Sequence, residues 1–292
     1  MRNDYDFVKL HGAGNDFVFI EDLNNQIDLT PEEIARICDR HFGVGADGVI
    51  FVRPPEDPCN SGFMDYRNAD GSIAQMCGNG VRCFAKYLVD YGIVEKNTPL
   101  LNVETRAGVK VISYSTTDEG KLLTATVDMG APILSPHLVP TTLAFNAMTE
   151  LGEAFVKESP IESPYGTFDF TCISMGNPHA VTFVDDCESI DIDCIGAYFE
   201  SCDAFPEKAN IEFATVKDDG IHMRVYERGC GETLACGTGA CATGVAAFLT
   251  GRTGAENDLI LLGGTLHIAY TPGGSVLMTG PAEESFTGTF SL

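Results

Sequence analysis

Two short stretches of this 292-residue chain echo each other, and they constrain its fold more than any other feature. The first is Cys77-Gly-Asn-Gly80 and the second is Cys236-Gly-Thr-Gly239. Each places a cysteine directly before a Gly-x-Gly, and a segment with the apolar spacing of a helix follows. The sequence therefore predicts that each thiol lies at the N-terminus of a helix.

The surroundings of the two stretches also repeat. Asn68 precedes the first cysteine by nine residues, and Glu227 precedes the second by nine. A Gly-Asn pair ending at Asn15 lies 62 residues before the first cysteine, and one ending at Asn177 lies 59 before the second. We interpret this pattern as a divergent internal duplication with a period of about 160 residues, in which each half delivers one cysteine to a shared site.

Length and composition favour two domains of mixed class. The chain is long enough for two ordinary domains, and an apolar content of 44% gives each a core. Many short strand-like runs with one or two helices per half predict an α+β fold with two pseudo-symmetric domains, each a mostly antiparallel or mixed sheet wrapped around a central helix. The proline-punctuated stretch 130–140 is the best domain boundary.

The expected elements follow from capping signals and periodicity. Thr30-Pro-Glu-Glu33 is a capping box with proline at the first helical position. The segment 240–249 is apolar almost all round, which predicts a buried helix. Helices are expected at about 31–41, 80–91, 190–201 and 240–249. Strands are expected at 5–10, 17–21, 49–52, 63–67, 100–105, 109–113, 122–129, 168–174, 181–184, 211–216 and 223–226, with four more after the last helix.

Charge and cysteine usage bound the class of protein. The formal net charge is −24 and the acidic residues are scattered, which argues against nucleic-acid and anionic-membrane partners. No apolar run approaches the roughly 18 residues of a membrane span. The polar N-terminus, residues 1–6, predicts no signal peptide. Eleven cysteines in such a chain indicate reduced thiols and a cytoplasmic protein.

The segment Gly43–Gly48 matches the dinucleotide pattern GxGxxG. Its predicted context is reversed, because a helix precedes it and the strand 49–52 follows it, whereas pyrophosphate binding needs the opposite order. We therefore expect no nucleotide site there.

Paired thiols at helix starts suit stereoinversion at carbon. Unpaired backbone N–H groups and the helix dipole favour a thiolate and bind anions. The lack of Cβ at Gly78, Gly80, Gly237 and Gly239 lets a carboxylate approach those amides. One cysteine would remove an α-proton and the other would return a proton to the opposite face, while the amides stabilise the carbanion through the carboxylate.

Two other uses of these cysteines fit the sequence less well. A redox pair is disfavoured because no C-x-x-C is present. Cys236-x4-Cys241 and Cys77-x5-Cys83 are poor zinc pairs, so no metal is expected. The remaining cysteines are most simply core residues or inert thiols: Cys38, Cys59, Cys172, Cys187, Cys194, Cys202 and Cys230.

Further candidates lie at matching points of the two halves. Four asparagines beside turns are equally explained as turn residues or as site residues; they are Asn15, Asn68, Asn177 and Asn210. His179 and Glu227 could orient or tune the thiols. Glu227-Arg228 could recognise an ammonium and a carboxylate, with Arg228 offering a bidentate fork.

Six motifs in order resemble the diaminopimelate epimerase family over nearly the whole chain. They are His11-Gly-Ala-Gly-Asn-Asp-Phe17, Asn68-Ala-Asp-Gly-Ser72, Cys77-Gly-Asn-Gly80, Met175-Gly-Asn-Pro-His179, Asn210-Ile-Glu-Phe213, and Glu227-Arg-Gly-Cys-Gly-Glu232 with Cys236-Gly-Thr-Gly239.

The resemblance implies a cofactor-independent, PLP-independent epimerase that interconverts LL- and meso-diaminopimelate, in lysine and peptidoglycan-precursor biosynthesis. It implies Cys77 and Cys236 as the acid/base pair, assisted by His179 and Glu227. It further implies a set of substrate contacts: Asn15, Asn68, Asn177, Asn210, Glu227 and Arg228, with Gly78-Asn79 and Gly237-Thr238 as carboxylate cradles.

The resemblance also implies two similar α/β domains that close over the substrate. We expect a first domain over 1–130 with the returning strand 282–292, and a second over 131–281. A homodimer is left open. Some members of the family carry glutamine where this chain has Gly48, so no side-chain contact is expected from that position.

Two rival functions remain at this point. A racemase of the proline or hydroxyproline type also uses two cysteines as acid and base. Glu227-Arg228 and the extra asparagines favour instead a substrate with a second amino-acid end. A non-catalytic binding or thiol-redox protein is the rival from another class.

Overall fold

The computed structural model describes residues 4–95 and 98–292, so part of the polar N-terminal stretch, residues 1–3, lies outside the described residues. The chain forms two compact units. Unit 1 comprises Met1–Asp128 with Thr279–Leu292, and unit 2 comprises Met129–Met278. Each unit therefore carries one of the two Cys-Gly-x-Gly stretches.

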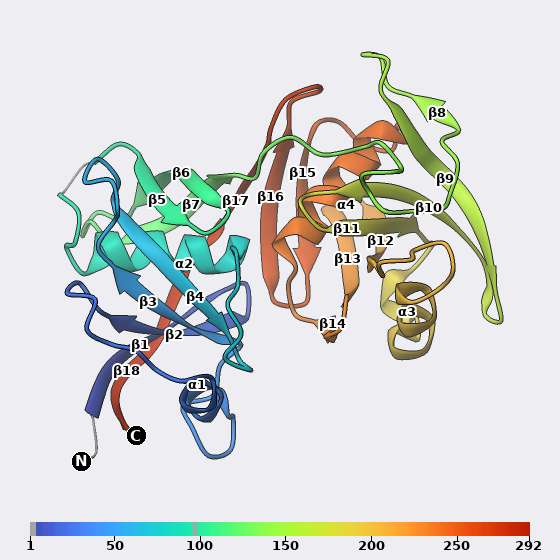
Figure 1. Cartoon of the computed structure of the whole chain (residues 1–292). Helices are drawn as coiled ribbons and strands as arrows, with labels where there is room; N and C mark the ends of the chain where they lie inside the picture. Colours follow the sequence, from blue (N-terminus) through green and yellow to red (C-terminus); the bar gives the residue numbers. More distant parts are fainter. Residues whose placement is uncertain (1–3, 96–97) are drawn as a thin grey trace. The chain divides into compact units, whose positions relative to one another are not determined.

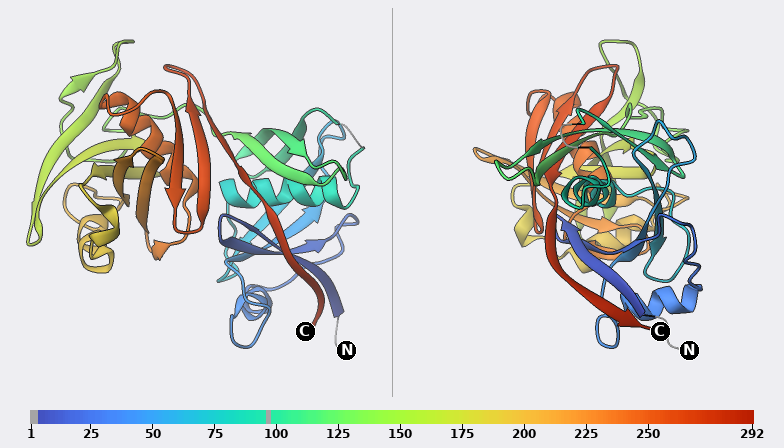
Figure 2. Two further views of the ribbon diagram at one scale, coloured as in Figure 1. Left: turned by 180° about the vertical axis from the view of Figure 1, so that it is seen from behind. Right: turned by 90° about the vertical axis from the view of Figure 1, so that its left-hand side faces the viewer.

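Unit 1 wraps a mixed sheet around one helix. Its elements are β1 (Asp4–Gly12), β2 (Asn15–Glu21), α1 (Pro31–Cys38), β3 (Gly48–Arg53), β4 (Gly62–Asn68), α2 (Gly78–Asp90), β5 (Leu101–Thr105), β6 (Gly108–Thr116), β7 (Leu122–Asp128) and β18 (Glu283–Ser291). β1 pairs antiparallel with β2 and β18, and β2 runs parallel to β3. Helix α2 packs against β1, β2, β4, β5 and β7, and is seen end-on in the right-hand panel of Figure 2.

Unit 2 repeats this plan. Its elements are β8 (Ala147–Met148), β9 (Ala154–Ser163), β10 (Gly166–Ser174), β11 (Pro178–Phe183), the 3-10 turn η1 (Cys187–Ser189), α3 (Ile192–Glu200), β12 (Asn210–Lys217), β13 (Gly220–Glu227), β14 (Gly231–Thr233), α4 (Gly237–Leu249), β15 (Glu256–Leu261), β16 (Gly264–Tyr270) and β17 (Val276–Pro281), whose last residues belong to unit 1. Helix α4 packs against β10 to β13 and against β15 and β16 (Figure 1).

The internal duplication appears in the strand register. In unit 1, β2 and β3 are parallel with Phe17 opposite Gly48; in unit 2, β11 and β12 are parallel with His179 opposite Asn210. In both units the next pair, β3–β4 and β12–β13, is antiparallel. The predicted fold class is confirmed. Among the described residues, no helix combines the length and apolarity that crossing a bilayer requires.

Local sequence explains where α1 begins and ends. Thr30 Oγ1 accepts from the Glu33 N–H and Glu33 Oε2 accepts from the Thr30 N–H, so the capping box is formed. The helix stops at Cys38, earlier than predicted, because the Asp39 carboxylate accepts from the backbone N–H groups of His41 and Phe42 at 2.7 and 2.8 Å. The GxGxxG segment follows α1 and ends at the first residue of β3, in the reversed order expected.

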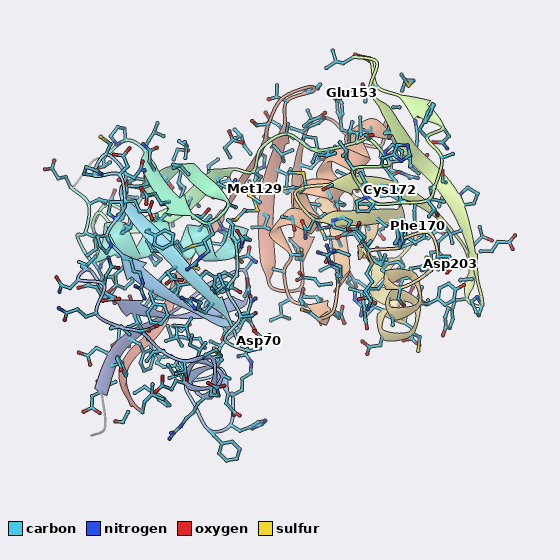
Figure 3. The ribbon with its side chains drawn as sticks, in the orientation of Figure 1. Asp70, Met129, Glu153, Phe170, Cys172 and Asp203 are labelled. Carbon is cyan, nitrogen blue, oxygen red and sulfur yellow. The ribbon has the colours of Figure 1, made fainter. Side chains whose placement is uncertain are left out.

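The strands β8, β9 and β14 were not predicted. β9 carries a polar run and Pro160, which hide its alternation, yet it pairs antiparallel with β10. Tertiary pairing therefore overrides local propensity here. Phe170 and Cys172 of β10, labelled in Figure 3, are fully buried in the core of unit 2. As predicted, α4 is buried almost all round.

Arg82 of α2 is fully buried and holds three oxygens of unit 1: Asn79 Oδ1 at 2.9 Å, and the carbonyls of Gly78 and Pro281, each at 3.3 Å. Replacing Arg82 with Met removes these side-chain hydrogen bonds from a buried site. We expect the free energy of unfolding to fall by about 3 kcal/mol, measured by urea denaturation. The exposed Lys121→Met variant is the control and should change it by less than about 0.5 kcal/mol. Equal shifts in both variants would contradict this role.

Candidate active site

Both motif cysteines are helix N-caps with closely similar geometry. Cys77 has extended backbone angles (φ −139°, ψ 125°), and its Sγ accepts from the Gly80 N–H at 3.4 Å. Cys236 has φ −115° and ψ 110°, and its Sγ accepts from the Gly239 N–H at 3.4 Å. Each sulfur thus takes the place of a capping oxygen against an amide that has no partner inside the helix. The arrangement favours charge on sulfur and binding of an anion at the same helix end.

Asn15 connects the Cys77 thiol to a charged network. Its Oδ1 lies 3.5 Å from the Cys77 sulfur and 3.2 Å from Asn79 Nδ2, and it accepts from both groups. Its Nδ2 donates to Asp47 Oδ2 at 2.7 Å. The amide of Asn15 is therefore held in one orientation, with its oxygen toward the thiol.

Asp47 belongs to an ion-pair cluster around the loop between α1 and β3. Arg40 bridges Asp47 and Asp16 at 2.7 and 2.8 Å, and the buried Lys9 ammonium contacts Asp16 at 2.7 Å and the Gly45 carbonyl. Burial raises the pKa of Asp16, but the hydrogen bonds from Arg40 and Lys9 outweigh it and lower that pKa to about 2. Asp16 is therefore ionised at neutral pH, and its ion pairs help to fix the loop that carries Asp47.

The side chain of Asn79 is used inside unit 1. It is buried, donates to Asn15 and accepts from Arg82 at 2.9 Å. A contact from Asn79 to a ligand would therefore come from its main-chain N–H, as it would from Gly78, at the first turn of α2.

The Cys236 thiol lies deeper than the Cys77 thiol. Cys236 is only 5% exposed, whereas Cys77 is half-buried. Burial, followed by the nearby charges of Glu227 and Glu212, raises the pKa of Cys236, against hydrogen bonds from Thr238 and the Gly239 N–H. The Thr238 hydroxyl lies 3.4 Å from the sulfur. This cysteine is therefore a protonated thiol at neutral pH.

His179 is enclosed in unit 2 by two partners. Its Nδ1 lies 2.6 Å from Glu212 Oε1, and its Nε2 lies 3.0 Å from Asn177 Oδ1. The side chains of His179 and Glu212 are both completely buried. Burial raises the pKa of Glu212, and the histidine opposes that shift.

Asn210 links β11 to the Glu227-Arg228 segment. Its Nδ2 donates to the Pro178 carbonyl and its Oδ1 accepts from the Arg228 N–H, both at 2.9 Å. Glu227 is half-buried and accepts from the Thr233 hydroxyl, while the exposed Arg228 guanidinium reaches the Glu207 carbonyl at 3.2 Å. Asn210 therefore joins the Pro178 turn to the Glu227-Arg228 segment within unit 2.

Asn68 lies at the end of β4, where its Nδ2 donates to Ser72 Oγ at 2.9 Å within its own turn. It stands opposite Gly48 in the register. A Cβ at Gly48 would lie 2.5 Å from both the Arg67 carbonyl oxygen and the Tyr66 ring, so no side chain fits there. This explains why position 48 can offer no glutamine-like contact.

The other cysteines have settings unlike the two motif thiols. Every cysteine in the chain is free. Burial raises the pKa values of Cys38, Cys83 and Cys172 to about 12, which makes these thiols inert at neutral pH. Over residues 4–95 and 98–292, no three His, Cys, Asp or Glu side chains gather as metal ligands would.

Comparison with known families agrees with this geometry. The model of the family "Diaminopimelate epimerase" matches residues 7–135 and 171–284. The chain belongs to the diaminopimelate epimerase family. It is 46% identical over 289 residues to the diaminopimelate epimerase of Leptospira biflexa, covering 98% of this chain and 99% of that protein. It is 44% identical over 286 residues to diaminopimelate epimerase 1 of a Nostoc species, covering 97% of this chain and 98% of that protein.

Solved structures outside this family share the fold. A Bacillus anthracis phenazine biosynthesis protein of the PhzF family has a TM-score of 0.68 at 17% identity, over 99% of each chain. A hydroxyproline epimerase from Agrobacterium vitis has a TM-score of 0.68 at 14% identity, over all of this chain and 94% of that one. At such identities the likeness shows the fold alone.

Sequence reasoning missed three residues that support the family motifs: Asp47, Arg82 and Glu212. Asp47 lies in the GxGxxG segment, and Arg82 lies within α2, where a long charged side chain is ordinarily expected to face solvent. Glu212 had a usable signal, because a charged residue inside the apolar run 211–214 of a predicted strand calls for a buried partner.

The raised pKa of Cys236 gives a prediction about Glu227. Burial is the largest cause and the Glu227 charge the next, so Glu227→Gln should move the midpoint of Cys236 alkylation to lower pH, because a nearby negative charge disfavours the thiolate. The measurement is alkylation with a small reagent across a pH series, read by peptide mass spectrometry. The exposed Cys59, measured in the same samples, should keep its profile. An unchanged or higher midpoint for Cys236 would contradict the assignment.

Proposed function

We propose that this chain is a cofactor-independent, PLP-independent diaminopimelate epimerase, which interconverts LL- and meso-2,6-diaminopimelate through Cys77 and Cys236. The observation that carries the proposal is that both cysteines are N-caps of glycine-cradled helices, each with its sulfur against a backbone N–H. Membership of the family, with relatives 40 to 46% identical over nearly the full chain, supplies the substrate.

The proposed reaction moves one proton through two thiols. A thiolate removes the α-proton, and the thiol of the second cysteine delivers a proton to the opposite face of the carbon. The proposal therefore requires both thiols to reach opposite faces of one α-carbon. The raised pKa of Cys236 suits its thiol to the proton-donating role, and in the opposite direction the two cysteines exchange roles.

The proposed contacts divide between the reacting and the distant end of the substrate. The main-chain N–H groups of Gly78-Asn79 and Gly237-Thr238 bind the α-carboxylate at the two helix starts, where they also stabilise the carbanion. His179 and Glu227 assist. The other ammonium and carboxylate groups of the substrate are assigned to polar side chains, namely Asn15, Asn68, Asn177, Asn210, Glu227 and Arg228.

The alternative is a related two-cysteine racemase acting on proline or hydroxyproline. The fold is compatible with it, since a hydroxyproline epimerase and a probable proline racemase share the topology at 14 and 15% identity. Sequence identity to diaminopimelate epimerases is about three times higher. The free cysteines are consistent with a reducing compartment, and we propose a cytoplasmic enzyme.

Isotope exchange distinguishes these substrates. Incubated in deuterated water with LL-diaminopimelate, the enzyme should form meso-diaminopimelate carrying deuterium at the inverted α-carbon, detected by NMR and mass spectrometry. L-proline and trans-4-hydroxy-L-proline, treated identically, should remain unlabelled. Exchange confined to proline or its hydroxylated form would refute the assigned substrate.

Each cysteine should be needed for turnover. Cys77→Ala and Cys236→Ala should each lower kcat at least about a hundredfold, because each removes one of the two proton-transfer groups. Both variants should still bind meso-diaminopimelate in calorimetry, since the helix amides remain. Cys59→Ala is the control and should turn over like the unmodified enzyme. Full activity in either motif variant would exclude the two-base mechanism.

A further inference from the structure

The two units differ at one pair of equivalent buried positions. Aligning the parallel strand pairs places Phe17 of β2 at the position of His179 of β11. Gly48 of β3 likewise matches Asn210 of β12. Ile50 and Glu212 each lie two residues further along these strands, so Ile50 corresponds to Glu212.

The pairs meet their helices at the same point. A Cβ built on Gly80, the third residue of α2, would lie 3.1 Å from Ile50 Cδ1. A Cβ built on Gly239, the third residue of α4, would lie 2.8 Å from Glu212 Oε1. Each strand residue therefore touches the helix turn that the cysteine caps. In unit 1 the contact is apolar, and in unit 2 it is a carboxyl group.

Burying the polar pair in unit 2 costs folding free energy. Glu212 and His179 are both completely buried, and Glu212 Oε2 has no hydrogen-bond partner among the described residues. Burying such a pair is often no better for stability than a well-packed apolar pair of similar volume. The Phe17 and Ile50 pair shows that the same topology accepts apolar residues at these positions. Stability therefore does not explain the polar pair.

The proton arrangement of the pair follows from its burial. A net charge is unfavourable in a buried site. A carboxylate beside a neutral imidazole would carry one negative charge, so Glu212 and His179 together bind one additional proton. That proton lies on Glu212 or on Nδ1, within the 2.6 Å contact. In both cases Nε2 carries the other ring proton and donates it to Asn177 Oδ1 at 3.0 Å.

We propose that Glu212 is a positioning residue of the Cys236 half, which holds His179 with a proton on Nε2 and thereby fixes the Asn177 amide with its oxygen inward. The N–H₂ group of the half-buried Asn177 then points away from the ring, toward a hydrogen-bond acceptor of the ligand. A carboxylate oxygen of an amino acid fits that donor. This inference rests on the proposed function and adds a residue to its site.

The hydrogen-bonded relay Glu212–His179–Asn177 has a counterpart of different construction in unit 1. There the Asn15 amide is held from its nitrogen side by Asp47, at 2.7 Å, and its oxygen faces the Cys77 thiol. In unit 2 the matching Asn177 is held from its oxygen side by His179. The two asparagine amides are therefore held from opposite ends, and only in unit 2 does the amide N–H₂ group remain turned away from the residue that holds it.

Three substitutions test this inference through kcat/KM for both isomers. Glu212→Leu leaves Nδ1 without a partner and should lower kcat/KM about tenfold or more, chiefly by raising KM. Glu212→Gln can still donate to Nδ1 and should stay within about threefold of the unmodified enzyme. In an Asn177→Ala background, Glu212→Leu should add less than about a twofold loss, because its effect passes through that amide. Asp258→Asn, which breaks the exposed Asp258–His267 pair of unit 2, is the matched control and should change nothing.

A second measurement separates positioning from structural support. The double variant His179→Phe with Glu212→Ile copies the apolar pair of unit 1, so its melting temperature should equal or exceed that of the unmodified enzyme while kcat/KM falls at least about tenfold. Should the double variant not fold, the single variants and the Asn177→Ala cycle still decide. Unchanged kcat/KM in Glu212→Leu, or losses that multiply fully with those of Asn177→Ala, would overturn the inference.

Nitrogen-15 NMR of the histidine rings provides a readout that needs no turnover. The His179 signal, assigned by its loss in His179→Phe, should show Nε2 protonated across neutral pH in the unmodified protein. A bare Nε2 would overturn the inference even in an active enzyme. The two proposals can fail separately. If the unmodified protein shows the protonated Nε2 but lacks epimerase activity, the proposed function is refuted and the positioning role of Glu212 is retained.

Discussion

The capping of a helix by cysteine is the interaction on which the rest of the structure depends. A cysteine at this position brings its sulfur to a backbone N–H that has no partner inside the helix. Glycine at the third helical residue lets a side chain of the neighbouring strand approach the first turn closely. Gly80 and Gly239 both have this role, because a Cβ on either would press on Ile50 or Glu212. The strands that pass under each helix therefore determine what surrounds each thiol, and the surrounding sheet holds those strands in place.

The two units use the same scaffold to support their thiols differently. In unit 1, the amide beside Cys77 is held by Asp47, which Arg40 in turn binds, while the buried Arg82 secures Asn79. In unit 2, Cys236 lies deeper, and burial, followed by the nearby charge of Glu227, raises its pKa. Duplication thus provided two equivalent helix ends, and divergence of the residues beneath them left the Cys236 thiol more deeply buried than the Cys77 thiol.

The fold by itself does not select a reaction. The same topology occurs at a TM-score of 0.68 in a hydroxyproline epimerase and in a phenazine biosynthesis protein of the PhzF family, both below 20% identity. Selection must therefore lie in the side chains around the helix ends. Under the proposed function, those side chains include the asparagine amides held from opposite ends and the exposed Arg228. Gly48 contributes none of this selection, because the Tyr66 ring fills the space that a side chain would need.

The sequence by itself determined the duplication, the fold class and the two thiols at helix starts, because capping residues, glycine spacing and apolar periodicity are local signals that survive divergence. It also placed Asn15, Asn68, Asn177 and Asn210 at matching points of the halves. Only the tertiary structure decided how these residues are held. Glu212 lies 33 residues from His179 and Asp47 lies 32 from Asn15, and each pair meets across parallel strands or loops that no local pattern specifies. The same physics hid β9, whose polar run and proline become a strand only because β10 offers it a hydrogen-bonding edge.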